Sequence, residues 1–331
     1  MSAEHLFTTS GATGVPRQWL RSVAQMEREA ALILNRWAPN AREIFAFAPA
    51  SHSYGMILGE VGARVLDAHL QVCSLEQQQL PLLDGDGPCV ILAIASTWRV
   101  LPALLARLAT RRAVLVVHSA SLLPPDALAI VRRHAGPQVR FVELLGSTET
   151  GAMAYRELDA SSSPEQAWTL LDDVTLLSHV GQPCALEVAS PRIAREPHQA
   201  LPAASHCCDD QILALDAHSF QWLGRASSLI KVNGLRVDLA RVASELQQRL
   251  QCPTLACVAV RDELRGEAFE VLFSSKTLSE RAVMHMFQQL PPGYPYPVAV
   301  RRVAELPLSA TGKPLPLAAT NAVKDYTHDS R

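Results

Sequence analysis

The chain has 331 residues, a length that favours about two domains. Hydrophobic residues make up 48% of it and charged residues 19%, a balance that excludes a disordered chain. The formal net charge of −2 gives no electrostatic reason to expect nucleic acid or an anionic membrane as a partner, and no apolar run reaches the roughly 18 residues of a membrane span.

The first 150 residues alternate between helix patterns and strand patterns. We expect helices over Trp19–Trp37, from about Tyr54, over Trp98–Thr110 and after Pro124, and strands over Ile44–Ala50, Cys89–Ala95, Ala113–Val117 and Val139–Leu145. Strands that are apolar on both faces and alternate with helices predict a parallel sheet with helices on both sides.

The pattern changes twice in the second half. Between Trp168 and Leu223 the segments are shorter and strand-like, which predicts a small antiparallel β subdomain. Beyond Gly224 we expect a compact α+β domain, with strands over Leu229–Val232, Thr254–Arg261, Phe269–Phe273 and Val298–Val303 and helices over Leu239–Leu250 and Leu278–Leu290. The sequence thus predicts an α/β main domain over residues 1–224 and a small mobile domain over residues 225–331, joined near Gly224–Ser228.

Two motifs in the main domain are suited to binding phosphate. Thr8–Arg17 (TTSGATGVPR) combines hydroxyl donors and one positive charge with glycines, which let the backbone turn and expose its N–H groups to an anion. Gly146–Gly151 (GSTETG) directly follows the fourth expected strand, where α/β folds bind ligands; its threonine could bind a phosphate and its glutamate Mg²⁺. Each motif by itself also fits a plain alternative, a mobile terminus for the first and a solvated turn for the second.

Two further motifs lie beyond the main domain's last strand. They are Gly224–Val237 (GRASSLIKVNGLRV) and Leu306–Lys313 (LPLSATGK). Taken singly, either is an ordinary hinge or a turn with a surface lysine.

The order and spacing of the four motifs resemble the adenylate-forming superfamily of acyl- and aryl-CoA synthetases, luciferases and peptide-synthetase adenylation domains. The motifs are similar, in order, to that family's TSGTTGxPK, GxTE, GRxDxxIKxxGxR and LPxxxxGK segments. Lesser matches are Ser51–Gly55, at the position of a family HxxG segment near the acyl pocket, and Ser119–Asp126, similar to an SGGAPLPPE region. Asp210 lies fifteen residues before Arg225, the spacing of the family's ribose-binding aspartate.

The resemblance implies ATP-dependent activation of a carboxylic acid, aromatic or fatty, as an acyl adenylate, followed by thioester formation with CoA or with the phosphopantetheine of an acyl carrier protein. It implies a role in secondary metabolism and the cofactors ATP, Mg²⁺ and CoA or phosphopantetheine. Lys313 would bridge the carboxylate and the α-phosphate, Thr148 would bind the α-phosphate and Glu149 would hold Mg²⁺. Such a reaction brings two anions together, so positioning and positive charge supply most of the catalysis.

The remaining implied roles concern binding. The β- and γ-phosphates would be held by Thr9, Ser10, Gly11, Thr13, Gly14 and Arg17. Asp210 would accept hydrogen bonds from the ribose with Arg225 nearby, and His52 and Gly146 would line the acid pocket. In the second step the small domain would turn about its hinge, remove Lys313 and bring Gly234 and Arg236 towards the thiol.

Several departures from the family pattern leave alternatives open. The phosphate motif begins at residue 8, whereas the family has a large segment before it. Leu145 replaces an aromatic residue, Arg17 replaces a lysine and Ser227 stands at the hinge position. The second hypothesis is therefore a non-catalytic nucleotide-binding or scaffold relative that completes a partner protein, and the third is a fragment of a longer ligase.

The cellular compartment and the partners of the protein are predicted from its cysteines, its first residues and the unmatched family segment. Seven cysteines without a CxxC pair and a start without a secretory signal favour the reducing cytoplasm. Apolar surface left by the unmatched family segment favours a homodimer or a complex with a partner subunit over residues 1–60. The partners expected are a small carboxylic acid and an acyl carrier protein.

Overall fold

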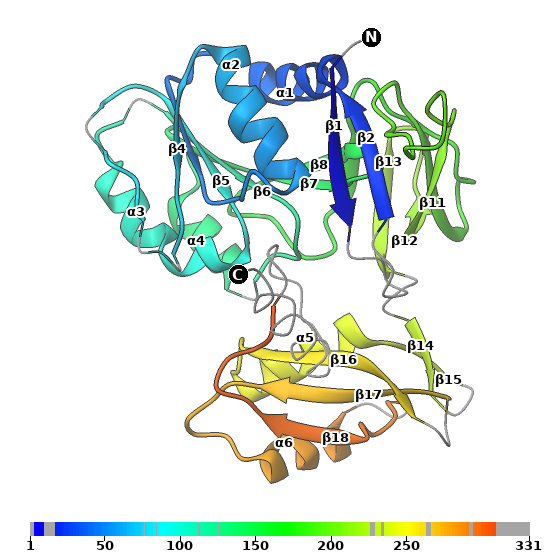
Figure 1. The fold of residues 1–331 in the computed structure, drawn as a ribbon. Coiled ribbons are helices and arrows are strands. Elements are labelled where there is room, and N and C mark those ends of the chain that lie inside the picture. The colour runs from blue at the N-terminus through cyan, green and yellow to red at the C-terminus, as the bar shows by residue number, and fades with distance from the viewer. Residues whose placement is uncertain are drawn as a thin grey trace, which may run out of the picture. The chain divides into compact units, whose positions relative to one another are not determined.

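The computed structural model describes residues 3–9, 17–75, 77, 79–83, 85–111, 113–124, 126–225, 229–232, 235–262, 266–290 and 294–308. The chain divides into two compact units, Met1–Leu223 and Gly224–Arg331. Each unit has its own sheet and its own buried core (Figure 1).

The first unit is built on a mixed sheet of eleven described strands. Their order across the sheet is β10-β11-β12-β13-β9-β8-β7-β6-β5-β3-β4. The parallel half consists of β3 (Glu43–Ala46), β4 (His69–Val72), β5 (Cys89–Ala93), β6 (Val114–His118) and β7 (Val139–Ser147). The other half consists of β8 (Gly151–Leu158), β9 (Trp168–Leu170), β10 (Thr175–Leu176), β11 (Pro183–Ala189), β12 (His206–Ala214) and β13 (Ser219–Arg225).

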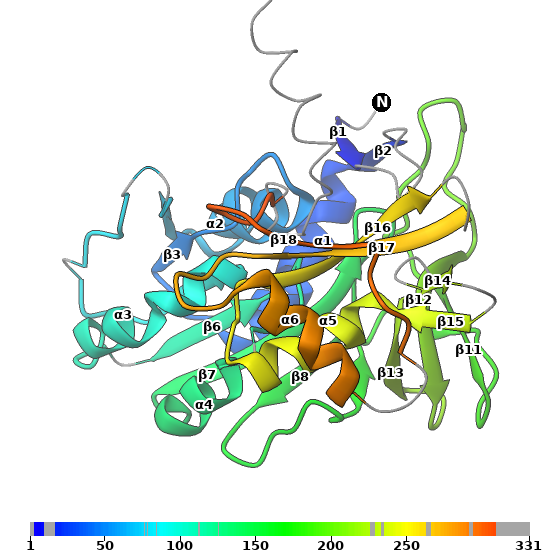
Figure 2. The ribbon, with the colours of Figure 1, turned by 90° about the horizontal axis from the view of Figure 1, so that it is seen from below.

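Helices cover both faces of the parallel half. One face packs against α1 (Val23–Trp37), the π-helical segment η1 (Gly55–Val61) and α2 (Gly62–Leu66). The other face packs against the 3₁₀ segment η2 (Ala95–Arg99), α3 (Leu101–Arg107) and α4 (Ala127–His134). Successive side chains of β5 point to opposite faces of the sheet. Val90 lies in the core on the α1 face, and Ile91 lies in the core on the α3 face. Figures 1 and 2 show α1 and α4 on opposite sides of this sheet, which confirms the expected fold class.

The antiparallel strands continue the parallel sheet instead of forming a separate layer. β8 pairs antiparallel with β7, so the two halves share one set of hydrogen-bonded strands. The sequence pattern missed β8, whose first residue, Gly151, is the last residue of a motif that favours a loop. It also missed the edge strand β4, which is short and polar at its first position.

The expected helix over Trp19–Trp37 is wrong in its first turn. Residues Arg17–Ser22 form β2, which pairs antiparallel with β1 (Glu4–Thr9). Trp19 lies opposite Phe7 and both are buried, so cross-strand packing outweighs the local helical spacing. The helix begins after Ser22, whose side chain and that of Gln25 form a capping box.

The second unit contains a three-stranded sheet and a separate hairpin. β16 (Leu255–Asp262) is antiparallel to β17 (Gly266–Phe273), which is parallel to β18 (Ala299–Arg302). The hairpin consists of β14 (Leu229–Val232) and β15 (Leu235–Asp238). The helices are α5 (Leu239–Leu250), α6 (Glu280–Met286) and the 3₁₀ turn η4 (Phe287–Gln289). Asp238 caps α5 by accepting hydrogen bonds from the N–H groups of Ala240 and Arg241.

No helix in the described part of the chain is long and apolar enough to cross a membrane.

Candidate functional site

The first two residues and the last residue of the phosphate motif belong to the β1–β2 hairpin. Thr9 ends β1 and Arg17 begins β2, and the two are cross-strand partners, so residues 10–16 start and finish at neighbouring points. The predicted residues Ser10, Gly11, Thr13 and Gly14 lie outside the described residues. The hairpin thus provides a fixed base for the expected phosphate loop.

The GSTETG motif forms the tight turn between β7 and β8. Ser147 and Gly151 pair across the strands, and Thr148, Glu149 and Thr150 make the turn. The Ser147 hydroxyl accepts a hydrogen bond from the Thr150 N–H at 3.3 Å, and the Thr150 hydroxyl donates to the carbonyl of Gly151 at 2.9 Å. The side chains of Ser147 and Thr150 therefore stabilise the backbone of the turn, whereas those of Thr148 and Glu149 do not take part in these hydrogen bonds.

The two residues assigned to catalysis in this turn have different surroundings. Thr148 is buried, and Glu149 is half-buried. Within the described residues the Glu149 side chain makes no hydrogen bond or ion pair. Its backbone carbonyl accepts a hydrogen bond from the Ala194 N–H at 2.7 Å. The turn is thus fixed through its backbone while the carboxylate stays available to a ligand.

Gly146 is required for the close packing of the β7–β8 turn. A Cβ at this position would lie 2.7 Å from the Cα of Ala152 and would overlap the carbonyl of Gly151. Its expected role in the acid pocket therefore stays a prediction, while its role in closing the β7–β8 turn is plain from the geometry.

A second loop lies at the carboxyl end of the neighbouring parallel strand. Ser119 directly follows β6, and its hydroxyl donates to the carbonyl of Leu144 in β7 at 3.0 Å. Ala120 has a positive φ of 70°, which a residue with a Cβ seldom adopts. His118 Nδ1 accepts from Trp98 Nε1 at 3.1 Å, and its Nε2 lies 2.9 Å from the carbonyl of Ser121. Both loops end adjacent parallel strands, where ligands bind in folds of this kind.

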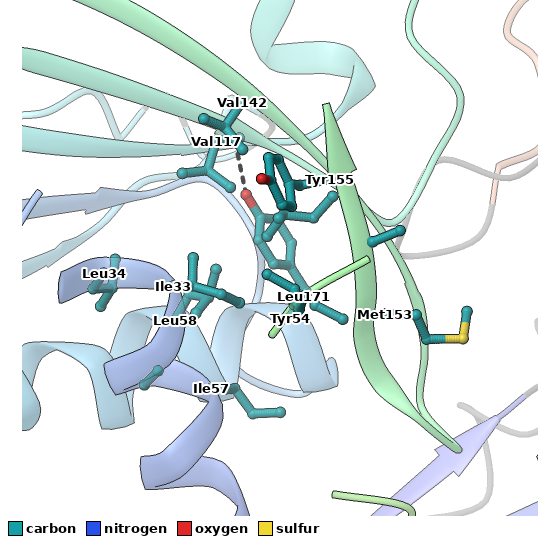
Figure 3. Packing of buried hydrophobic residues seen from close by; sticks show 14 of the residues in the cluster. Ile33, Leu34, Tyr54, Ile57, Leu58, Val117, Val142, Met153, Tyr155 and Leu171 are labelled. Atoms are coloured by element: carbon teal, nitrogen blue, oxygen red, sulfur yellow. Dashed lines mark hydrogen bonds between the residues drawn. The ribbon is translucent and has the colours of Figure 1, made fainter. Parts of the chain in front are cut away.

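Residues at the predicted acid pocket pack mainly into the core. His52 is half-buried, and its Nδ1 accepts from the Tyr54 N–H at 3.3 Å. The Tyr54 hydroxyl donates to the Val117 carbonyl at 2.8 Å, and Tyr54 belongs to the buried cluster that includes Leu58 and Tyr155 (Figure 3). Burial raises the pKa of the Tyr54 phenol well above its ordinary value. Tyr54 therefore stays neutral and joins the residues around η1 to β6.

The predicted ribose residue is almost fully buried. Asp210 in β12 is 3% exposed, and its Oδ1 accepts a hydrogen bond from Nε1 of Trp222 in β13 at 2.8 Å. Arg225 ends β13, and Arg236 lies in β15. Gly234 and Lys313 lie outside the described residues.

A buried ionic cluster beneath the GSTETG turn was missed by the sequence analysis. It consists of Arg21, Glu29 and Arg192, with Asp173 bound to Arg192. The one signal available was Glu29 itself, because it occupies a position on the apolar stripe of α1 between Met26 and Ile33. Among the described residues no group of three or more histidine, cysteine or acidic side chains is arranged to hold a metal ion.

Comparisons with known proteins identify the fold. No family model and no curated sequence matches the chain. Among solved structures, ATP-bound MatB from Rhodopseudomonas palustris matches with a TM-score of 0.69 and 18% identity over 98% of this chain and 68% of that one. The anthranilate CoA ligase AuaEII in complex with anthranoyl-AMP matches with a TM-score of 0.70 and 17% identity over 97% of this chain and 67% of that one. The o-succinylbenzoate CoA synthetase MenE from Bacillus subtilis, in complex with its acyl-adenylate intermediate, matches with a TM-score of 0.68 and 15% identity over 98% and 69%.

These three proteins belong to the adenylate-forming superfamily, and the chain has the fold of that superfamily. It spans about two thirds of the length of each of these structures.

Proposed function

We propose that this protein activates a carboxylic acid with ATP as an acyl adenylate and then transfers the acyl group to the thiol of CoA or of a carrier-protein phosphopantetheine. The observation that carries the proposal is the connection between the GSTETG turn and the base of the phosphate loop. The Glu149 carbonyl binds the Ala194 N–H, and the next residue, Arg195, exchanges two backbone hydrogen bonds with Leu20 of β2. The two segments assigned to the nucleotide are thus held together by the backbone.

In the first step the acid's carboxylate attacks the α-phosphorus of ATP and pyrophosphate leaves. Thr148 would donate a hydrogen bond from its hydroxyl to the α-phosphate, and Arg17 would bind the β- and γ-phosphates. Glu149 suits Mg²⁺, which prefers one or two carboxylates together with phosphate oxygens and water. Bound Mg²⁺ would neutralise charge on the phosphates. The availability of the Glu149 carboxylate among the described residues supports this assignment.

The second unit would contribute the remaining groups. Lys313 would bridge the two anions in the first step, where a fixed positive charge stabilises the charge that develops. Gly234 and Arg236 would serve the second step, beside the thiol. The neighbours in complex with ATP or with acyl-AMP support the use of ATP, and they give no acceptor for this chain.

One observation favours the second candidate, a non-catalytic nucleotide-binding or scaffold relative. Asp210 is nearly inaccessible and is bound to Trp222, so a ribose hydroxyl must compete with this bond for the carboxylate. Asp209, the neighbouring acidic residue, is exposed. If Asp210 serves only the sheet, the nucleotide would bind weakly or not at all.

ATP–pyrophosphate exchange with a panel of carboxylic acids tests the two candidates. Acid-dependent exchange supports the ligase, and the panel should contain benzoic, cinnamic and medium-chain fatty acids. ATP binding without exchange by any acid supports the non-catalytic candidate. A comparison of CoA with phosphopantetheinylated carrier protein as the acyl acceptor identifies which thiol is used in the second step.

The association of the chain with itself or with a partner subunit stays a prediction. Light scattering at micromolar concentration measures it, because a dimer has twice the mass of the monomer. A stable monomer that adenylates an acid would show this prediction to be wrong.

A further inference from the structure

The side chain of Glu29 lies at the junction of three segments that are far apart in the sequence. It projects from the buried face of α1 and is 5% exposed. Its Oε1 accepts a hydrogen bond from the Ala152 N–H at 2.9 Å, and its Oε2 accepts one from Nη2 of Arg21 at 2.8 Å. A carboxylate with a donor on each oxygen is held in one orientation, and such charge-assisted bonds are strong in a buried setting.

Arg192 completes the cluster. Its Nη1 lies 3.2 Å from Oε2 of Glu29, and its carbonyl accepts a hydrogen bond from Nη2 of Arg21 at 2.8 Å. Arg21 and Arg192 are both fully buried. Burial acts to lower the pKa of Arg192, but Glu29 and then Asp173 outweigh it, so the pKa is raised. The Glu29 carboxylate therefore lies between two buried guanidinium groups.

The partners of Glu29 connect the two parts of the nucleotide site. Arg21 belongs to β2, the strand that follows the phosphate motif. Ala152 is the second residue of β8 and comes directly after the GSTETG motif. Arg192 lies two residues before Ala194, whose N–H binds the carbonyl of Glu149. One carboxylate is thus bonded to the base of the phosphate loop, to the end of the turn and to the segment that supports the turn.

The last glycine of the motif leaves the space that this cluster fills. Gly151 has a positive φ of 72°, and a Cβ there would lie 2.7 Å from Nη2 of Arg21 and would overlap Oε2 of Glu29. A side chain at this position would strain the backbone and also displace the carboxylate. The glycine and the glutamate are therefore parts of one arrangement, although 122 positions separate them.

We propose that Glu29 is a positioning residue for adenylation: through Arg21, Arg192 and Ala152 it fixes the Thr148–Glu149 turn relative to the hairpin that carries the phosphate loop. This role rests on the proposed function, and Glu29 itself touches no substrate. Apolar side chains of similar volume frequently stabilise a core as well as buried ions do, so stability alone does not call for charge at this place. What the ions add is direction, because Glu29 binds the backbone N–H of Ala152 and Arg21 binds the backbone carbonyl of Arg192.

The test compares Glu29→Gln with Glu27→Gln, an exposed glutamate on the same helix. Amide hydrogen exchange is the first readout, because it requires no activity. In Glu29→Gln we expect residues 146–152 and 190–195 to exchange at least ~10-fold faster, with β5 and β6 unchanged. In Glu27→Gln we expect no change. Equal exchange in the two variants, or faster exchange spread evenly over the first unit, would overturn the proposal.

Pyrophosphate exchange is the second readout. Displacement of the turn should lower kcat for adenylation by about 100-fold in Glu29→Gln and raise the Mg²⁺ concentration needed for half-maximal rate. Glu29→Asp keeps the charge and should recover part of the rate, and it replaces Glu29→Gln in both readouts if that variant does not fold. An unchanged kcat and Mg²⁺ requirement in a variant with a loosened turn would overturn the positioning role. If the unaltered protein exchanges no pyrophosphate with any acid, the proposed function fails, while hydrogen exchange still decides whether Glu29 fixes the turn.

Discussion

The indole N–H of Trp222 donates a hydrogen bond to Oδ1 of Asp210 at 2.8 Å, across the neighbouring strands β13 and β12. The bond ties the predicted ribose residue to its own sheet. Asp210 therefore supports the sheet, and its predicted role in binding the nucleotide can be measured separately from that support.

Asp210→Asn should weaken ATP binding, because each ribose hydrogen bond to a carboxylate is charge-assisted and contributes about 1.5–3 kcal/mol. Trp222→Phe removes one competing donor and should leave ATP affinity unchanged or raise it, while lowering the melting temperature. Calorimetric titration and thermal unfolding measure the two effects. Equal ATP affinity in Asp210→Asn and the unaltered protein would remove Asp210 from the site and make exposed Asp209 the next residue to test.

Lys313→Ala should lower the rate of adenylation by about 10² or more, as loss of a preorganised charge does. Thioester formation from a supplied acyl adenylate should change much less, because the role proposed for the lysine belongs to the first step alone. Lys276→Ala removes an exposed lysine from the same unit and is the matched control. Pyrophosphate exchange and thiol consumption measure the two steps. Equal loss in both would contradict the role given to Lys313.

The stability of the first unit should fall as pH decreases below about 6.5. Burial is the main reason that the pKa of His118 is lowered from 6.5 to about 4. Between these values the unfolded chain binds a proton that the folded protein does not, so unfolding becomes easier as pH falls. The full effect is on the order of 3 kcal/mol.

His118→Gln isolates this contribution, because it removes the titrating group and keeps a polar side chain. Urea unfolding at a series of pH values should give a shallower slope for the variant between pH 6.5 and 4. The difference between the two proteins in the free energy of unfolding at each pH cancels the titration of the groups that they share. These include Glu143, whose pKa is raised by burial. Parallel slopes would mean that His118 is protonated equally in the folded and unfolded states.

Ala120→Gly should stabilise the protein or leave it unchanged. Ala120 has a φ of 70°, a conformation that costs a residue with a Cβ roughly 1–2 kcal/mol and costs glycine nothing. The greater freedom of glycine in the unfolded chain offsets about 0.4–1 kcal/mol of this gain. Ala129→Gly, at an exposed position in α4, should instead destabilise by about 1 kcal/mol. Chemical unfolding measures the free energy of unfolding of both variants. A clear loss of stability in Ala120→Gly would show that the backbone at Ala120 is not strained.

The sequence by itself determined the features that depend on local pattern. The strands β5, β6 and β7 were predictable because each is apolar on both faces, and the alternation with helices indicated the parallel sheet. Helix α5 matches its expected bounds, since a capping aspartate and an apolar stripe mark it. The four motifs also indicated the fold, because their order along the chain is itself a property of the sequence.

Only the tertiary structure decided the features that depend on distant partners. Arg17–Ser22 has helical spacing but pairs as a strand with Glu4–Thr9, because Trp19 buries its ring against that hairpin. The burial of Asp210 depends on its neighbour Trp222 in the next strand. The hydrogen bond from the Ala152 N–H to Glu29 joins positions that no periodicity relates. Sequence pattern reports which face of an element is buried, whereas the partner that meets a buried charge is fixed only when the sheet and its helices pack together.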